Sequence, residues 1–94
     1  MNFELSHLGR RPHSTVFGSA VDGDDATVRV VDTGEILCLS RLDGEDGWTV
    51  DTAFGPDGRP LWVHAYGTRT GDTVTAPQPL ADALTARCAE RAHQ

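Results

Sequence analysis

The sequence predicts an α+β fold, in which an antiparallel β-meander of about six short strands precedes one C-terminal helix. Short β-rich runs fill residues 2–66, and turns of Gly, Asp and Pro interrupt them about every ten residues. After a polar loop at 67–76, the hydrophobic period changes to that of a helix at 79–91. Ninety-four residues fit one domain, 1–94, and we expect its helix to pack on the sheet. A small closed barrel with the helix as a lid is the alternative, because the sequence does not reveal the order of the strands.

Each predicted strand is a run rich in β-branched, aromatic or other apolar residues. Residues that tolerate tight-turn backbone angles separate the runs, with turns or loops at 9–12, 22–25, 32–35, 42–47 and 55–59. In the last of these, Pro presets the second turn position and Gly accepts the left-handed conformation. The predicted strands are 2–8, 14–21, 26–31, 36–41, 48–54 and 61–66, with a brief extension of the sheet at 73–75.

An apolar stripe predicts the C-terminal helix. Leu80, Ala83, Leu84 and Cys88 recur at i, i+3, i+4 and i+8. Because this stripe is narrow, the helix is expected to need the sheet for its stability. Cys88 and the strand residue Cys38 are expected to be buried, reduced thiols, since no secretory signal precedes them. A strand–helix disulfide between them stays open as an alternative.

Charge and composition limit the classes of partner. The chain carries fourteen acidic residues against eight basic ones, a net charge of −6, and all eight bases are Arg. Such a surface repels phosphate, so direct nucleic-acid binding is not expected, whereas a basic protein partner would be attracted. No apolar run approaches the ~20 residues of a membrane span, and no signal peptide is visible, so a cytoplasmic location is expected. Arg without Lys is typical of GC-rich coding, which points to a bacterial or phage source.

No catalytic or metal-binding pattern is recognisable in the sequence. There is no P-loop, dinucleotide fingerprint or nucleophile-elbow motif. The four His and two Cys lack the spacing of a zinc site. The acidic segments 22–25 and 43–47 lack the downstream Glu of a calcium loop, and solvated turn residues explain them better. We therefore expect a protein that is not an enzyme and has no cofactor or metal.

The hairpin at 55–59 has two alternative registers, and they differ in which side chains reach the surface. Turn chemistry favours pairing Gly55 with Arg59, which puts Trp62 opposite Thr52 and the aromatic residues in the core. A slip of one residue would instead separate apolar from polar side chains. Trp62, His64 and Tyr66 would then form an outward stripe beside Asp51. The sequence leaves both registers open.

These features favour a small non-catalytic interaction protein, such as an inhibitor, an immunity protein or an accessory protein. Trp and Tyr are enriched at the energetic centres of protein interfaces. One alternative is an acidic nucleic-acid mimic of the phage anti-defence type, occupying a basic groove, and another is a small-molecule-binding domain around His64. A homodimer through open sheet edges is a further expectation. The predicted partner-binding residues are Trp62, His64, Tyr66, Asp51, Asp22, Asp24, Asp25, Asp43, Glu45 and Asp46.

Overall fold

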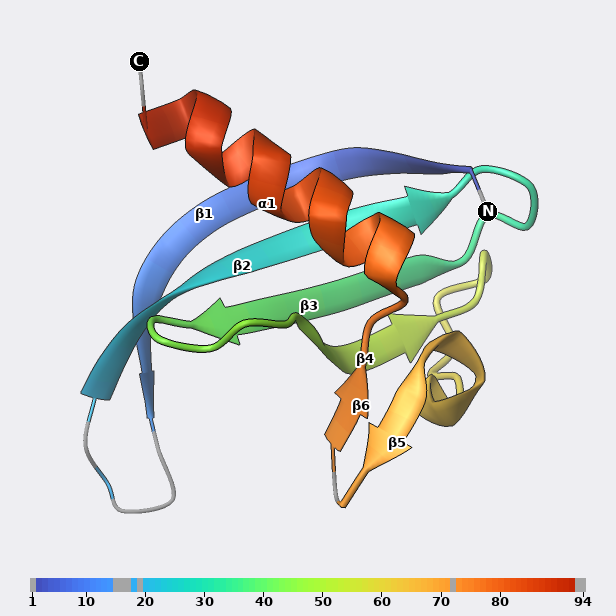
Figure 1. Cartoon of the computed structure of the whole chain (residues 1–94). Coiled ribbons are helices and arrows are strands. Elements are labelled where there is room, and N and C mark those ends of the chain that lie inside the picture. Colours follow the sequence, from blue (N-terminus) through green and yellow to red (C-terminus); the bar gives the residue numbers. More distant parts are fainter. Residues whose placement is uncertain (1, 15–17, 19, 72, 93–94) are drawn as a thin grey trace.

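The computed structural model describes residues 2–14, 18, 20–71 and 73–92. These residues form an open six-stranded antiparallel sheet with one C-terminal helix, which confirms the predicted α+β meander (Figure 1). The strands lie in the order β1-β2-β3-β4-β6-β5. The elements are β1 (Phe3–Ser14), β2 (Ala20–Val30), β3 (Ile36–Leu42), β4 (Thr49–Phe54), the 3₁₀ helix η1 (Val63–Tyr66), β5 (Thr68–Thr70), β6 (Thr73–Thr75) and α1 (Gln78–Ala92).

The first two strands form one long hairpin, where the sequence predicts three short strands. The predicted turns at 9–12 and 22–25 are wrong, because these segments pair with each other, with Pro12 opposite Asp22. Pro12 is tolerated because β1 is an edge strand. Gly23 suits a close approach, since a Cβ there would meet the Arg41 carbonyl oxygen at 2.8 Å. The predicted strand 14–21 lies partly outside the described residues.

The middle of the sheet agrees closely with the sequence prediction. β3 and β4 overlap the predicted strands 36–41 and 48–54. Gly34 adopts a φ of 77° in the turn before β3, as a tight hairpin requires. Gly58 has a φ of 83°, and the Gly55 N–H donates a 2.8 Å hydrogen bond to the Arg59 carbonyl. The hairpin therefore closes in the register that its turn chemistry favours.

The predicted sixth strand, 61–66, is wrong. The returning chain pairs with β4 only at the isolated bridge Phe54↔Pro60 and through the Leu61 N–H, which donates to Ala53. It then turns away into η1. The place beside β4 is taken farther along by β6, which pairs with it at Thr49.

The predicted polar loop 67–76 supplies the last two strands. β5 and β6 form a small hairpin, and the extension expected at 73–75 is confirmed as β6. Gly67, directly after η1, packs against the backbone of β6. A Cβ at this position would collide with the Thr75 carbonyl oxygen, so a residue without a side chain lets the hairpin fold back.

The core lies between the helix and one face of the sheet (Figure 1). Leu80 and Leu84 of the predicted stripe are fully buried, while Ala83 and Cys88 are half-buried. Both cysteines are free thiols, as expected, but both are half-buried, whereas the sequence predicts buried thiols. No helix in the described part of the chain has the length and apolar character to cross a membrane. The buried apolar residues are Ala26, Val28, Val30, Leu37, Leu39, Trp48, Val50, Ala53, Val74, Ala76, Leu80, Ala81 and Leu84.

Candidate functional site

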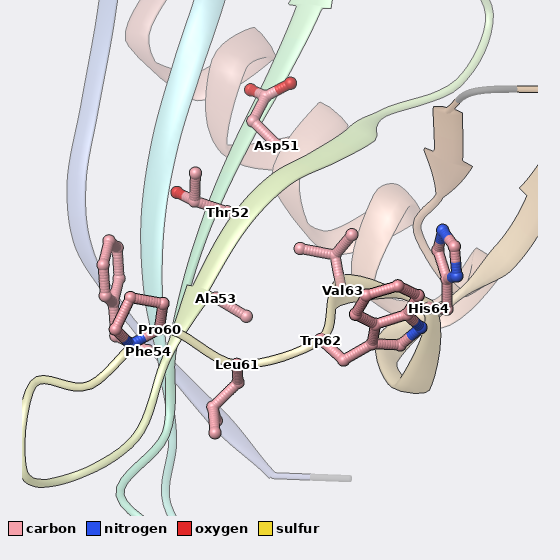
Figure 2. A pocket seen from close by; sticks show the side chains of 9 residues that line it. All are labelled: Asp51, Thr52, Ala53, Phe54, Pro60, Leu61, Trp62, Val63 and His64. Atoms are coloured by element: carbon pink, nitrogen blue, oxygen red, sulfur yellow. The ribbon is translucent and has the colours of Figure 1, made fainter.

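An apolar pocket lies beside β4, where the returning chain leaves the sheet. Ala53 accepts a 2.8 Å hydrogen bond from the Leu61 N–H, and four residues before Ala53, Thr49 pairs with Thr75 of β6. Between these two contacts the chain of Leu61 diverges into η1. The resulting cavity, which we call the Trp62 pocket, has a volume of about 330 Å³. It is lined by Asp51, Thr52, Ala53, Phe54, Pro60, Leu61, Trp62, Val63 and His64 (Figure 2).

Trp62 is the dominant side chain of this pocket. It is 73% exposed, and Leu61 next to it is also exposed. The ring centroids of Trp62 and His64 lie 4.8 Å apart, with an interplanar angle of 83° (Figure 2). Edge-to-face contacts between aromatic rings are favourable, and this one leaves most of the indole surface uncovered.

A β-bulge in β4 interrupts the alternation of its side chains beside the pocket. Cys38 of β3 pairs with Thr52 and Leu39 pairs with Val50, so Asp51 is the extra residue of the bulge. The alternation of buried and exposed residues breaks at this point. Val50 and Ala53 are buried, and the two residues between them are exposed. The bulge therefore places Asp51 and Thr52 side by side at the pocket.

Asp51 is the acidic group of the pocket, and it is electrostatically perturbed. Loss of hydration raises the pKa of Asp51 above its ordinary value of 3.8. A hydrogen bond with Ser40 and the positive charges of His13 and Arg11 lower the pKa in part, and the neighbouring carboxylate of Asp25 raises it. Asp51 thus links the pocket to the polar face of the sheet that the helix leaves uncovered.

The structure brings together three of the predicted partner-binding residues. Trp62, His64 and Asp51 all line the Trp62 pocket. Tyr66 does not join them, because η1 turns its half-buried side chain against the hydrophobic core. The outward stripe that a slipped strand register would produce is therefore not formed, and Trp62 is exposed through the loss of the strand instead.

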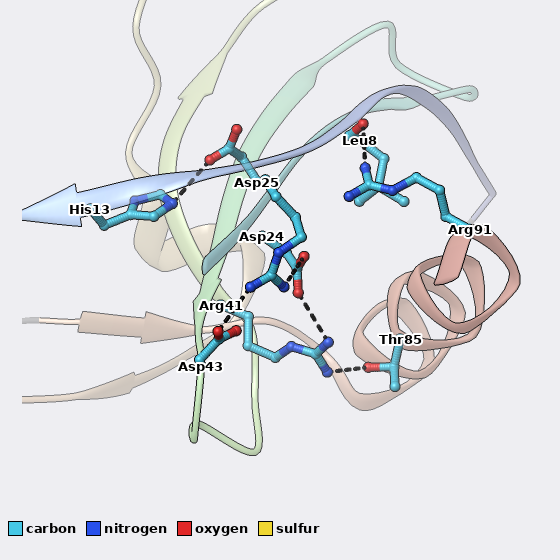
Figure 3. Close-up of polar contacts among 9 residues, drawn as sticks. Leu8, His13, Asp24, Asp25, Arg41, Asp43, Thr85 and Arg91 are labelled. Carbon is cyan, nitrogen blue, oxygen red and sulfur yellow. Dashed lines mark hydrogen bonds and ion pairs between the residues drawn. The ribbon is translucent and has the colours of Figure 1, made fainter. Parts of the chain in front are cut away.

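The predicted acidic residues do not form one solvated surface. Asp24 is buried on the helix side of β2, contrary to its predicted place in a turn, with ion pairs to Arg10 (3.0 Å) and Arg41 (3.2 Å) (Figure 3). Asp25 forms an ion pair with Arg11 at 2.8 Å, and Asp43 pairs with Arg10 at 2.8 Å. Within the acidic segments 22–25 and 43–47, the acids that are exposed and form no ion pair with other described residues are Asp22, Glu45 and Asp46.

Sequence reasoning missed several residues that shape these sites. Phe54, Pro60 and Leu61 form much of the pocket wall, although the sequence assigns them to a strand end and a turn flank. The sequence pattern also gives no sign that Arg10 and Arg41 neutralise a buried Asp24. Alternate residues of a β-strand share one face, so Asp24 lies on the same face as Ala26 and Val28. This period of two is the sequence signal that could have identified Asp24 as buried.

Within the described ranges, no three His, Cys, Asp or Glu side chains converge in a way that could hold a metal ion. The acidic segments 22–25 and 43–47 are held by arginines and backbone contacts. Comparison of the chain with protein-family models, with curated proteins and with solved structures finds no match.

Proposed function

We propose that this chain is a non-catalytic interaction module that binds a protein partner through the Trp62 pocket. The observation that carries the proposal is the exposure of Trp62 beside an apolar cavity. Exposed large apolar groups that form a patch are typical of interaction sites. Trp is also among the residues most enriched at the energetic centres of interfaces.

The fold does not need Trp62 for its core. The other tryptophan, Trp48, is fully buried and packs between the sheet and the helix. Trp62 leaves most of its indole in water, where its apolar surface gains little from folding. A partner that covered this ring would recover that hydrophobic free energy on binding.

The pocket indicates the chemistry of the partner. Its cavity of about 330 Å³ can accept one large apolar side chain, because its walls come mostly from Phe54, Pro60, Leu61 and Trp62. Asp51 supplies a negative group beside this apolar space. In a chain with a net charge of −6, these features favour a segment that presents an aromatic or aliphatic residue next to Arg or Lys.

The two alternative functions receive less support from the geometry. A nucleic-acid mimic needs a row of free carboxylates, whereas Asp24, Asp25 and Asp43 are engaged by arginines of the same chain. A small-molecule site is the better alternative, because the pocket volume lies near the lower end of ligand cavities, about 300–1,000 Å³. The expectation that the chain is not an enzyme stays a prediction.

Peptide selection with a matched counter-selection tests the proposal. Immobilised wild-type protein and Trp62→Ala would each be panned against a random peptide phage library. We expect wild type alone to enrich peptides that combine a large apolar residue with an adjacent Arg or Lys. Val31→Ala is the control, because Val31 is also exposed and does not line the pocket. Enrichment of the same peptides by Trp62→Ala would overturn the proposal.

Fluorescence then measures binding of a selected peptide. Trp48 is buried, so acrylamide should quench mainly Trp62 in the free protein. Binding should reduce the quenchable fraction, and Trp62→Ala should weaken the affinity by about 30-fold or more, the effect of removing a dominant interface Trp. Unchanged quenching with a bound peptide would place the contact elsewhere.

A further inference from the structure

A second cavity lies on the helix side of the sheet, between the C-terminal half of α1 and strands β1 to β3. It has a volume of about 510 Å³ and is separate from the Trp62 pocket. Three arginines reach it from three elements, Arg10 from β1, Arg41 from β3 and Arg91 from the last turn of α1. The lining, which we call the arginine cleft, consists of Arg10, Asp24, Arg41, Thr85, Cys88, Ala89 and Arg91.

The charges within the arginine cleft do not cancel. Asp24 uses both carboxylate oxygens, Oδ1 for Arg10 and Oδ2 for Arg41. Asp43 takes a second bond from Arg10 at the rim, at 2.8 Å. Arg91 donates only to the neutral carbonyl oxygen of Leu8, at 2.9 Å (Figure 3). Three guanidinium groups thus face two carboxylates, which leaves local positive charge in a chain of net charge −6.

Neutralisation of the buried Asp24 explains two of the arginines but not the third. A buried carboxylate needs partners, and Arg10 and Arg41 supply them. Arg91 forms no ion pair within the described residues, and its exposed side chain bends across the cleft to β1. Its remaining N–H groups are therefore available to an anion.

Thr85 adds a neutral donor to the arginine cleft. Its Oγ1 accepts hydrogen bonds from Arg41 Nη1 at 3.1 Å and from Trp48 Nε1 at 3.2 Å. A hydroxyl oxygen has two acceptor sites, so both are occupied and the O–H must act as a donor. In the part of the chain that the structure describes, no contact provides an acceptor for this proton. The cleft thus combines excess positive charge with a hydroxyl donor fixed by its surroundings.

We propose that the arginine cleft binds a small anion of the phosphate class, either free phosphate or a phosphate monoester. A planar carboxylate is matched by a single guanidinium through two parallel bonds. Donors that come from β1, β3 and α1 approach from different directions, which suits the tetrahedral oxygens of a phosphate. This proposal is independent of the Trp62 pocket.

NMR titration of the full chain tests the proposal, with inorganic phosphate as the probe. Spectra of ¹⁵N-labelled protein would be recorded with increasing phosphate, and chloride would hold the ionic strength constant. We expect saturable shifts at the amides of Leu8, Thr85 and Ala89, which line or flank the cleft, and at the Arg Nε–H groups. Unchanged spectra, or shifts scattered over the molecule, would overturn the proposal.

Arg91→Gln is the decisive variant, because Arg91 is exposed and its loss leaves Asp24 with both of its arginines. The variant should weaken phosphate binding by about tenfold or more, the usual effect of losing a charged hydrogen bond. Arg87→Gln is the matched control, since Arg87 lies one turn earlier, pairs with Glu90 at 3.5 Å and does not line the cleft. Equal affinities for wild type and Arg91→Gln would refute the assignment.

Two further ligands test which class of anion the arginine cleft prefers. O-phosphoserine should compete with phosphate and shift the same amides. Whichever of the two binds more tightly shows whether the cleft prefers a phosphate monoester or free phosphate. Acetate should bind at least tenfold more weakly, because it is planar and singly charged. If acetate matched phosphate, the cleft would be a general anion site and the assignment to phosphate would be wrong.

Discussion

The buried Asp24 provides the sharpest test of the fold. It is the only charged side chain among the described residues that the structure buries, with 4% of its surface exposed. The substitution Asp24→Asn keeps the volume and removes the charge. Arg10 and Arg41 would then face an amide whose N–H₂ group cannot accept their hydrogen bonds.

The expected magnitude follows from the surroundings of the two arginines. Breaking a buried ion pair by removing one partner costs about 3–5 kcal/mol. The Arg10 side chain is 45% exposed, so water screens its ion pair with Asp24. The Arg41 side chain is only 20% exposed, so its ion pair with Asp24 is screened less. We therefore expect Asp24→Asn to lower the free energy of unfolding by about 2–4 kcal/mol. For a domain of this size, this corresponds to a fall in Tm of about 10–30 °C.

Urea unfolding at neutral pH, followed by the fluorescence of the buried Trp48, measures this loss. Asp43→Asn is the matched control, because Asp43 pairs with the same Arg10 but its own side chain is 53% exposed. Its loss should cost less than about 1 kcal/mol. If the two variants were equally stable, Asp24 would not be buried between arginines. Residues 22–25 would then fit the solvated turn that their composition predicts.

Two further predictions concern the titratable groups. The pKa of Asp51 lies above its ordinary value of 3.8, so folding favours its protonated form, and the stability it contributes falls as pH rises through the folded-state pKa. Asp51→Asn should thus be at least as stable as wild type at neutral pH. The difference in Tm between the variant and wild type should narrow as the pH falls toward 3.8. A large loss of Tm in the variant at neutral pH would contradict this prediction. Burial raises the pKa of the Cys88 thiol above 9.0, so iodoacetamide should modify it more slowly than glutathione near neutral pH. Peptide mass spectrometry distinguishes modification of Cys88 from that of Cys38. A modification rate of Cys88 equal to that of glutathione would show that Cys88 is not shielded.

The parts of the fold that the sequence predicts are those in which local and global preferences agree. β3 alternates buried Leu37 and Leu39 with half-buried residues, and the Gly34 turn before it has the positive φ that Gly supplies. The helix stripe packs on the sheet through Leu80 and Leu84. In these segments a period of two or of 3.6 residues is enough to identify the element and its buried face.

The long β1–β2 hairpin could not be predicted in this way, because its turn-like residues are stabilised by distant partners. Asp24 lies in β2, 14 residues after Arg10 and 17 residues before Arg41. Local preference assigns Asp and Gly to turns, but two guanidinium groups from neighbouring strands make a buried aspartate acceptable. The arginine cleft is not predictable from local sequence for the same reason, because it exists only when β1, β3 and α1 are assembled.

The register of the hairpin at 55–59 does not by itself determine whether Trp62 is buried or exposed. Gly55 pairs with Arg59, as turn chemistry favours, and Trp62 should then lie in the core opposite Thr52. The separation of apolar from polar side chains favours a register that is slipped by one residue, which would expose Trp62. The two expectations conflict only if the returning chain continues as a strand. The chain leaves the sheet after Leu61, and β6 pairs with β4 farther along, at Thr49, so a correctly closed hairpin still exposes Trp62. The pocket forms where the returning chain leaves the edge of the sheet, and the turn chemistry of the hairpin does not reveal that departure.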